Sequence, residues 1–193
     1  VARGEHPIHE ARSYGLNHQG RIDGILAAMA GAELDILFAF SPAAHHVDFG
    51  DGVALISGLK PLGPAFAALK AGGASALVVS PAWDGPRAEA GTRTDEVTAT
   101  DDLAATFASM FANDLPASGR IGIADLGKMA HGTAAAITSV TGAECVDFSG
   151  QLFTLAARKT DEEIENARQA TIIGEQTYQY MLEVAEPGMP ECQ

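Results

Sequence analysis

Apolar and polar residues follow two different spacings along most of the chain. A helical spacing of apolar residues begins at Arg21-Ile22, and Gly31 stops it. A continuous apolar run from Leu34 to Phe40 has the length of a buried strand and ends at Ser41-Pro42. Further strand-like runs lie at 66–70, 74–80, 96–99, 120–124 and 144–146, and further helical spacings at 101–111 and 127–140. Alternating strands and helices predict an α/β fold with a central sheet covered by helices.

The connections between these elements carry weaker patterns. The turn Ala71-Gly72-Gly73 predicts a hairpin between the runs on either side, with a short helix over 65–71 as the alternative. Thr100 or Asp101 is expected to cap the helix that follows. The stretch from Pro81 to Gly91 is rich in turn-forming residues, and we expect it to be irregular.

The final helical segment differs in kind from the others. A capping box, Thr160-Asp161-Glu162-Glu163, opens it, and Pro187 ends it. Steps of three and four residues separate Ile164, Ala167, Thr171, Gly174, Tyr178, Met181 and Ala185. Glycine costs a helix about 1 kcal/mol against alanine, so Gly174 on this stripe indicates close packing. A helix of about 25 residues, at 1.5 Å each, needs a surface to pack against, and we expect that partner to follow Gln193.

The length of the chain limits how many domains it can form, and its charge limits which partners it can bind. The 193 residues suffice for one domain with a full core. We expect a loose polar arm over 1–19, an α/β domain over 20–157, and a linker helix with the start of an absent second domain over 158–193. Twelve basic against 25 acidic residues give a net charge of −13, which excludes nucleic acid and an anionic membrane surface as partners. The apolar runs are too short to span a bilayer.

The two cysteines bear on the cellular compartment. Cys145 and Cys192 are far apart and form no CxxC pair, so the sequence indicates neither a disulfide framework nor a zinc ribbon. Isolated cysteines are typical of a reducing compartment, and we expect a cytoplasmic protein. Cys145 itself is expected to be a small core residue.

One segment resembles a dinucleotide-binding fingerprint. Arg120 to Gly127 reads as strand, turn and helix, and Asp147 follows about 20 residues on, where the ribose-binding acid is expected. Ala124, however, takes the position at which bare backbone should approach the pyrophosphate, and Asp125 adds a carboxylate beside it. An ordinary strand-to-helix connection is favoured, and a stand-alone nucleotide-binding domain is the alternative from another functional class.

The adjacent His45 and His46 are the remaining candidates for chemistry. Neighbouring residues of a strand point to opposite sides, and chelation on a helix requires a spacing of four, so the pair does not predict a metal site. We interpret the loop over 43–52 as a polar surface loop, or else one that reaches a ligand or another subunit's cleft. The chain has no nucleophile elbow, HExxH motif or P-loop, so no catalytic, cofactor-binding or metal-ligating residue is assigned.

Several segments occur together in an order that a known family shares. The matching segments are Arg21-Ile22, Leu34-Asp-Ile-Leu37, Val53-Ala-Leu-Ile-Ser-Gly58, Gly73 to Pro81, Arg120-Ile-Gly-Ile123, Lys159-Thr-Asp-Glu-Glu-Ile164 with Arg168 and Ala170, and Pro187-Gly-Met-Pro-Glu191. From about Arg21 to Glu191 the chain resembles the N-terminal domain of the creatinase, prolidase and Xaa-Pro aminopeptidase family, the pita-bread metallohydrolases. It departs from the family at Ala156, where an Arg is usual, and in a longer loop from Pro42 to Gly58.

The resemblance implies a fold and a function. The fold is a ribonuclease H-like three-layer sandwich with a central mixed sheet, followed by a long C-terminal linker helix. The function is that of a non-catalytic N-terminal domain of a metal-dependent Xaa-Pro peptidase, which serves in a homodimer and edges the neighbouring subunit's active site. His45 and His46 are then candidate substrate-edge residues. Two Mn²⁺, Co²⁺ or Zn²⁺ ions and a peptide or small-molecule substrate would bind in the absent catalytic domain, and a creatinase-like amidinohydrolase or another non-peptidase member is the alternative.

Overall fold

The computed structural model describes residues 18–42, 51–114, 119–140 and 144–190. By its internal contacts the chain divides into two units, of which one is the domain from His18 to Arg158. The other contains the segment from Lys159 onward. The two units are described separately.

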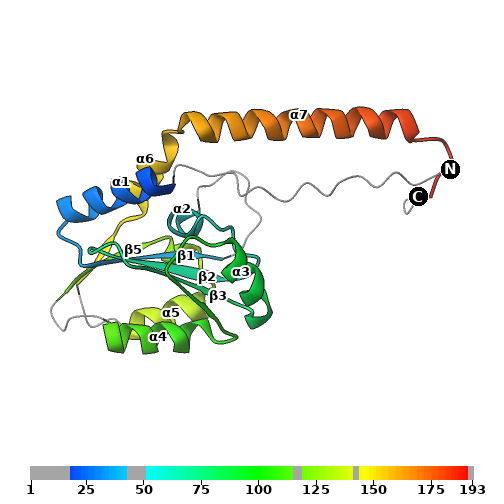
Figure 1. Cartoon of the computed structure of the whole chain (residues 1–193). Coiled ribbons are helices and arrows are strands. Elements are labelled where there is room, and N and C mark those ends of the chain that lie inside the picture. Colours follow the sequence, from blue (N-terminus) through cyan, green and yellow to red (C-terminus); the bar gives the residue numbers. More distant parts are fainter. Residues whose placement is uncertain (1–17, 43–50, 115–118, 141–143, 191–193) are drawn as a thin grey trace. The chain divides into compact units, whose positions relative to one another are not determined.

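The domain is built on one mixed sheet (Figure 1). Its strands are β1 (Ile36–Ser41), β2 (Ala65–Lys70), β3 (Ser75–Val79), β4 (Glu96–Ala99), β5 (Arg120–Ala124) and β6 (Glu144–Asp147). In space their order is β4-β3-β2-β1-β5-β6. Strand β2 runs antiparallel to both neighbours, and every other neighbouring pair is parallel. The predicted hairpin is thus confirmed as β2 and β3, and the alternative of a helix over 65–71 is wrong.

Helices cover both faces of this sheet. They are α1 (His18–Gly31), α2 (Gly52–Ser57), α3 (Gly85–Gly91), α4 (Leu103–Asp114), α5 (His131–Val140) and α6 (Ser149–Ala157), with 3₁₀ turns η1 (Ala82–Asp84) and η2 (Leu126–Lys128). Figure 1 shows α1, α2 and α6 on one face and α4 and α5 on the other. The architecture is therefore the expected three-layer α/β sandwich.

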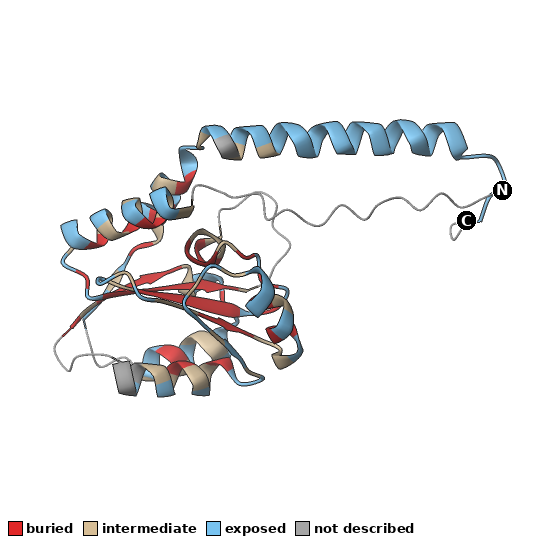
Figure 2. Ribbon diagram, viewed as in Figure 1, coloured by how far each residue is buried: buried red, intermediate tan, exposed pale blue. Residues whose placement is uncertain are grey.

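The central strands of the sheet are buried between the helices (Figure 2). The alternation of side chains along β1 divides the core into two layers. Leu37 and Ala39 face a layer that includes residues of α1, α2 and α6, whereas Phe38 and Phe40 face a layer with α4 and α5. In the second layer the ring of Phe107 lies 4.8 Å from that of Phe38, centroid to centroid. Because β1 is buried along its whole length, its sequence is a continuous apolar run.

Three details of the predicted secondary structure are corrected. Residues 82–91 form η1 and α3, so the stretch expected to be irregular is largely helical. The cap of α4 is Asp102, whose Oδ1 accepts from the Ala105 amide at 2.9 Å. The Thr100 hydroxyl oxygen in turn accepts from the Asp102 amide at 3.0 Å. Helix α5 begins at His131, because 126–128 close as a separate 3₁₀ turn.

Helix α6 is an element that the sequence analysis did not anticipate. Its N-cap residue is Phe148, whose side chain cannot accept a hydrogen bond from the first turn. The sequence therefore has no capping residue that would mark the start of this helix. The helix is held instead by packing, since Leu152 and Ala156 are buried one and two turns after the buried Phe148. Helix α6 is therefore stabilised by tertiary packing and not by its local sequence.

The second unit consists chiefly of α7 (Asp161–Val184). The capping box is formed: the Thr160 hydroxyl accepts from the Glu163 amide at 3.2 Å, and the Glu163 carboxylate accepts from the Thr160 amide at 2.6 Å. Its large exposed apolar residues are Ile164, Ile172, Ile173, Tyr178, Tyr180, Met181, Leu182 and Val184. A Cβ placed on Gly174 would meet nothing within 4 Å, so the close packing expected at this glycine is not present in the described chain.

Candidate functional site

Most of the loops that carry polar candidate site residues lie at one end of the sheet, which we call the Ser41 end. Strands β1, β3, β4, β5 and β6 finish there and β2 begins there, as the register pairs Ser41 with Ala65 and Ala65 with Val79. The segment between Pro42 and Asp51 starts and finishes at this end. His45 and His46, the predicted substrate-edge residues, belong to that segment and lie outside the described residues. What the structure shows is how the segment is anchored.

The two anchor points of this segment are joined by a hydrogen bond. The Ser41 hydroxyl donates to Oδ2 of Asp51 at 2.7 Å. Oδ1 of Asp51 accepts from the Val53 amide at 2.9 Å, so the same carboxylate caps α2. Both oxygens of Asp51 are thereby engaged, one with Ser41 and the other with the first turn of α2.

A hollow of about 560 Å³ lies beside the ends of β5 and β6. Asp125 pairs with Lys128 there at 2.9 Å, and the Asp125 amide donates to the Ser149 hydroxyl at 3.1 Å. That hydroxyl and the Ser149 amide donate to Asp147, at 2.6 and 2.9 Å. These two hydrogen bonds lower the pKa of Asp147, although partial burial opposes them. The polar groups of the hollow are thus largely bonded to one another.

The same geometry argues against a dinucleotide site. A fingerprint requires a strand, a tight glycine turn and a helix N-terminus aimed at the pyrophosphate. Here Asp125 takes a left-handed conformation with φ 62°, the 3₁₀ turn η2 follows, and α5 begins only at His131. Asp147, expected at the ribose, instead accepts from Ser149. A bound pyrophosphate would face the Asp125 carboxylate, which repels it.

Cys145 also lines this hollow, and it is exposed. The expectation of a core cysteine is therefore wrong. The reason is the position of β6, which is the last strand of the sheet and has only β5 as a neighbour. Three of its four residues are exposed.

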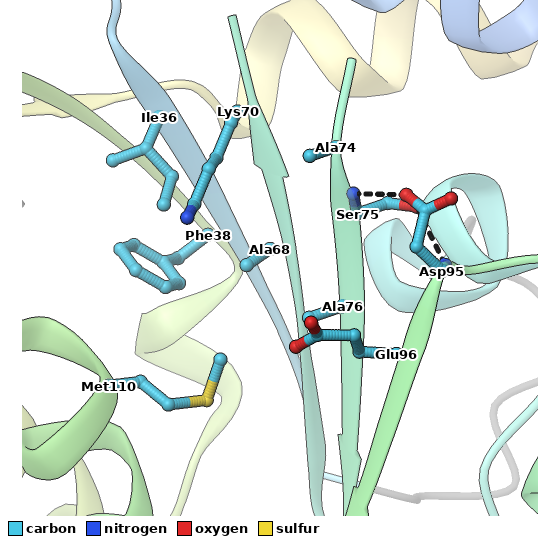
Figure 3. Close-up of a pocket in the computed structure, with 10 residues that line it drawn as sticks. All are labelled: Ile36, Phe38, Ala68, Lys70, Ala74, Ser75, Ala76, Asp95, Glu96 and Met110. Carbon is cyan, nitrogen blue, oxygen red and sulfur yellow. Dashed lines mark hydrogen bonds between the residues drawn. The ribbon is translucent and has the colours of Figure 1, made fainter. Parts of the chain in front are cut away.

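A second, smaller cavity of about 120 Å³ lies at the opposite end of the sheet (Figure 3). Lys70, Asp95 and Glu96 contribute its charged groups, and Phe38 and Met110 its apolar wall. One oxygen of Asp95 accepts from the Ser75 amide at 2.7 Å and from its hydroxyl at 3.0 Å. These bonds lower the pKa of Asp95, the amide having the larger effect. The carboxylate thus fastens β3 to β4, and the space suits a few water molecules.

Two kinds of feature are absent from the described residues. In the ranges 18–42, 51–114, 119–140 and 144–190, no group of three or more His, Cys, Asp or Glu side chains could hold a metal ion. Within the same ranges, none of the helices is long and apolar enough to cross a membrane.

The sequence analysis missed one pair of residues at the Ser41 end. Trp83, on the turn after β3, is 68% exposed, and Leu62, just before β2, is 49% exposed. The available signal was that Trp83 is the only tryptophan and stands two residues after a proline in a turn region. Exposed tryptophan on a loop that a rigid scaffold positions is typical of binding surfaces.

Comparison with solved structures assigns the fold. The prolidase from Pyrococcus furiosus is similar over 86% of this chain and 44% of its own, with 18% identity and a TM-score of 0.56. The prolidase from Pyrococcus horikoshii OT3 is similar over 89% and 45%, with 16% identity and a TM-score of 0.62. The N-terminal domain of the cytoplasmic peptidase PepQ from Mycobacterium tuberculosis H37Rv is similar over 70% and 98%, with 16% identity and a TM-score of 0.54.

The fold is thus that of the creatinase/prolidase N-terminal domain, as the resemblance implies. This chain spans less than half the length of the two full prolidases. No protein-family model and no curated protein matches the sequence.

Proposed function

We propose that this chain is the non-catalytic N-terminal domain of a metal-dependent Xaa-Pro peptidase. The observation that carries the proposal is the pattern of coverage. The chain covers 98% of a structure that consists of the PepQ N-terminal domain alone, but only 44% of a full prolidase. In this proposal a catalytic domain follows and holds two Mn²⁺, Co²⁺ or Zn²⁺ ions, whose chemistry there is to generate a hydroxide and polarise the scissile carbonyl.

Helix α7 supports a following domain. Ile164, Tyr178 and Met181 share one face of the helix and are exposed, and none of them belongs to the two core clusters of the described residues. A long helix with a bare apolar stripe gains stability when another surface covers it. We assign the catalytic domain as that surface.

The segment with His45 and His46 has the proposed role of edging the substrate site of a neighbouring subunit in a cytoplasmic homodimer. The described residues on either side of it are joined by the Ser41–Asp51 hydrogen bond, which supports a fixed base for the segment. Histidine suits such a role because a neutral imidazole both donates and accepts a hydrogen bond near pH 7.

The test measures hydrolysis with Mn²⁺ and an Xaa-Pro dipeptide. The 193-residue chain should give no turnover, and the protein extended through its following reading frame should give turnover. In the extended protein, His45→Ala and His46→Ala together should raise KM or lower kcat about tenfold or more, while His131→Ala, an exposed histidine on α5, should change neither.

Three results would count against parts of this proposal. Turnover by the 193-residue chain would overturn its non-catalytic role. Activity of the extended protein toward creatine, with none toward dipeptides, would replace the peptidase with an amidinohydrolase. Full activity in the double histidine variant would remove the substrate-edge role and leave the rest in place.

A further inference from the structure

The cavity at the end of the sheet opposite the Ser41 end lies over a floor of small side chains (Figure 3). In the register of the sheet, Phe38 lies beside Ala68 and Ala68 beside Ala76. Ala76 in turn lies beside Glu96, the first residue of β4. Aromatic rings fill much of the core layer on this face, whereas the two alanine methyl groups leave about 120 Å³ open.

Two opposite charges stand at the rim of this floor. Lys70 is the next residue of β2 after Ala68 that points to the same face of the sheet. Glu96 closes the row of paired residues on β4. Figure 3 shows Lys70 and Glu96 on either side of Ala68. The cavity therefore has a cationic side and an anionic side, with an apolar floor between them.

Each of the two charges can bind a ligand group of opposite sign. An ammonium has three donors, so Lys70 can donate to a carboxylate alongside the interaction that it already makes. Among the residues that the structure describes, none donates to the Glu96 carboxylate. Asp95 adds a second negative charge on the anionic side, where its Oδ2 accepts from the Ser75 amide.

The spacing of the two sides matches that of a zwitterion. Because β3 lies between them, β2 and β4 are two strand spacings apart, which is about 9.5 Å. The ammonium and carboxylate of an α-amino acid are about 3 Å apart, and a hydrogen bond of about 2.8 Å at each end extends this span to about 9 Å. A simple amine or a simple carboxylate would bind to one side alone.

The apolar wall and the volume define the side chain of the ligand. Phe38 and Met110 line the cavity, and the flexible thioether of Met110 adapts to differently shaped apolar groups. A space of about 120 Å³ equals the volume of about four liquid water molecules, which a single small amino acid can displace and a dipeptide exceeds.

We infer that this cavity binds a free α-amino acid with a small apolar side chain. The ligand carboxylate accepts from Lys70, and the ligand ammonium donates to Glu96. The side chain lies on Ala68 and Ala76, against Phe38 and Met110. The inference does not depend on the proposed peptidase function, because it concerns residues of this domain alone.

The experiment titrates L-valine into the 193-residue chain by isothermal titration calorimetry. L-Valine should bind saturably, with a Kd of about 1 mM or lower. Isobutylamine is valine without its carboxylate, and isovalerate is valine without its amino group. Each should bind at least about tenfold more weakly, because one of the two charged contacts is lost. In ¹H–¹⁵N spectra, the amides of residues 68–70, 74–76 and 96 should shift most.

Glu96→Gln is the decisive variant, because it removes the charge and keeps the shape of the side chain. It should raise the Kd for L-valine about tenfold or more. Glu144→Gln is the matched control, since Glu144 is likewise exposed and is the first residue of β6, and binding should not change. Lys70→Gln should weaken binding to a similar extent as Glu96→Gln, and Lys70→Arg should preserve it within about threefold.

The outcomes separate this inference from the proposed function. Absence of saturable L-valine binding up to about 20 mM would overturn the inference. Equal affinity for isobutylamine or isovalerate would show that one charge suffices and would overturn the zwitterion contacts. Amide shifts confined to the Ser41 end, or equal loss of binding in Glu144→Gln, would also overturn the assignment. None of these results bears on the proposed function, which hydrolysis by the extended protein tests.

Discussion

The sheet domain and helix α7 carry the same kind of apolar pattern with opposite outcomes. In the domain, apolar residues at helical or strand spacing are buried, as with Ile25 and Met29 of α1, which are 1% and 0% exposed. Helix α7 also carries apolar residues at helical spacing, yet Tyr178 and Met181 are 60% and 58% exposed (Figure 2). The comparison teaches that apolar spacing specifies an element and the face it will bury, whereas the partner must come from elsewhere in the chain or from another chain.

The two regions also differ in what makes their helices form. Helix α7 has a complete capping box, and its start is encoded within four residues. Helix α6 has no side-chain cap and depends on Leu152 and Ala156 packing into the first core layer. Substitutions in the domain should therefore act through packing, and substitutions in α7 through local helix propensity.

The largest expected effect is at the centre of the second core layer. Phe107 is 0% exposed, and its ring lies 4.8, 5.6 and 5.4 Å from those of Phe38, Phe40 and Phe66. Phe107→Ala should lower the free energy of unfolding by about 3–5 kcal/mol, because it opens a cavity among these rings. Urea unfolding followed by circular dichroism measures this change.

The matched control for Phe107 is an exposed aromatic residue. Phe153, 62% exposed, should tolerate alanine with a change within about 0.5 kcal/mol. If Phe107→Ala cost no more than Phe153→Ala, the aromatic layer would not stabilise the domain and the contrast between buried and exposed apolar residues would fail.

Much of the fold could be predicted from the sequence because a strand buried on both faces appears as a continuous apolar run. The runs that became β1, β3 and β5 are continuous and apolar, since helices cover both faces of the sheet. The cysteine environment could not be predicted, because Cys145 lies on a strand whose position at the sheet's end depends on the topology. Strand order follows from contacts between distant segments, and local spacing does not contain it.

The candidate site was less accessible to sequence reasoning than the fold. The role of Asp51 as a helix cap follows from the position of α2, which local spacing left open. Trp83 was missed because an isolated aromatic in a turn region has no periodicity to reveal whether it is buried. Its significance emerges only when Asp84, Arg87 and Leu62 are seen to converge on the same turn.

An intermediate effect, dependent on pH, is expected from the buried Asp84. Asp84→Asn should lower the free energy of unfolding near pH 7 by about 1–3 kcal/mol, because Arg87 loses its charged partner. Arg87 holds the pKa of Asp84 below the ordinary value of 3.8, so the wild-type advantage is fully present above 3.8. It should vanish as the pH falls through the lowered pKa, and urea unfolding at several pH values measures this.

Glu165 of α7 provides the control for that pH profile. Its pKa is also lowered, chiefly because Gln169 donates to it, but the group is exposed. Glu165→Gln should leave the unfolding of the sheet domain unchanged at every pH, since exposed pairs contribute little. An Asp84→Asn difference that persisted below the lowered pKa would mean that something other than the carboxylate charge stabilises the turn.

The smallest effect tests the proposed partner of α7. In the 193-residue chain, Gly174→Ala should stabilise α7 locally by about 1 kcal/mol, because alanine favours the helix and its methyl group meets nothing within 4 Å. Hydrogen exchange of the α7 amides should slow accordingly. In the protein extended through its following reading frame, a domain packed closely on the stripe would reverse the sign, because the added methyl group would then meet packed atoms. Slower exchange in both proteins would show that the covering surface leaves room at Gly174, and faster exchange in the short chain would mean that α7 already has a partner.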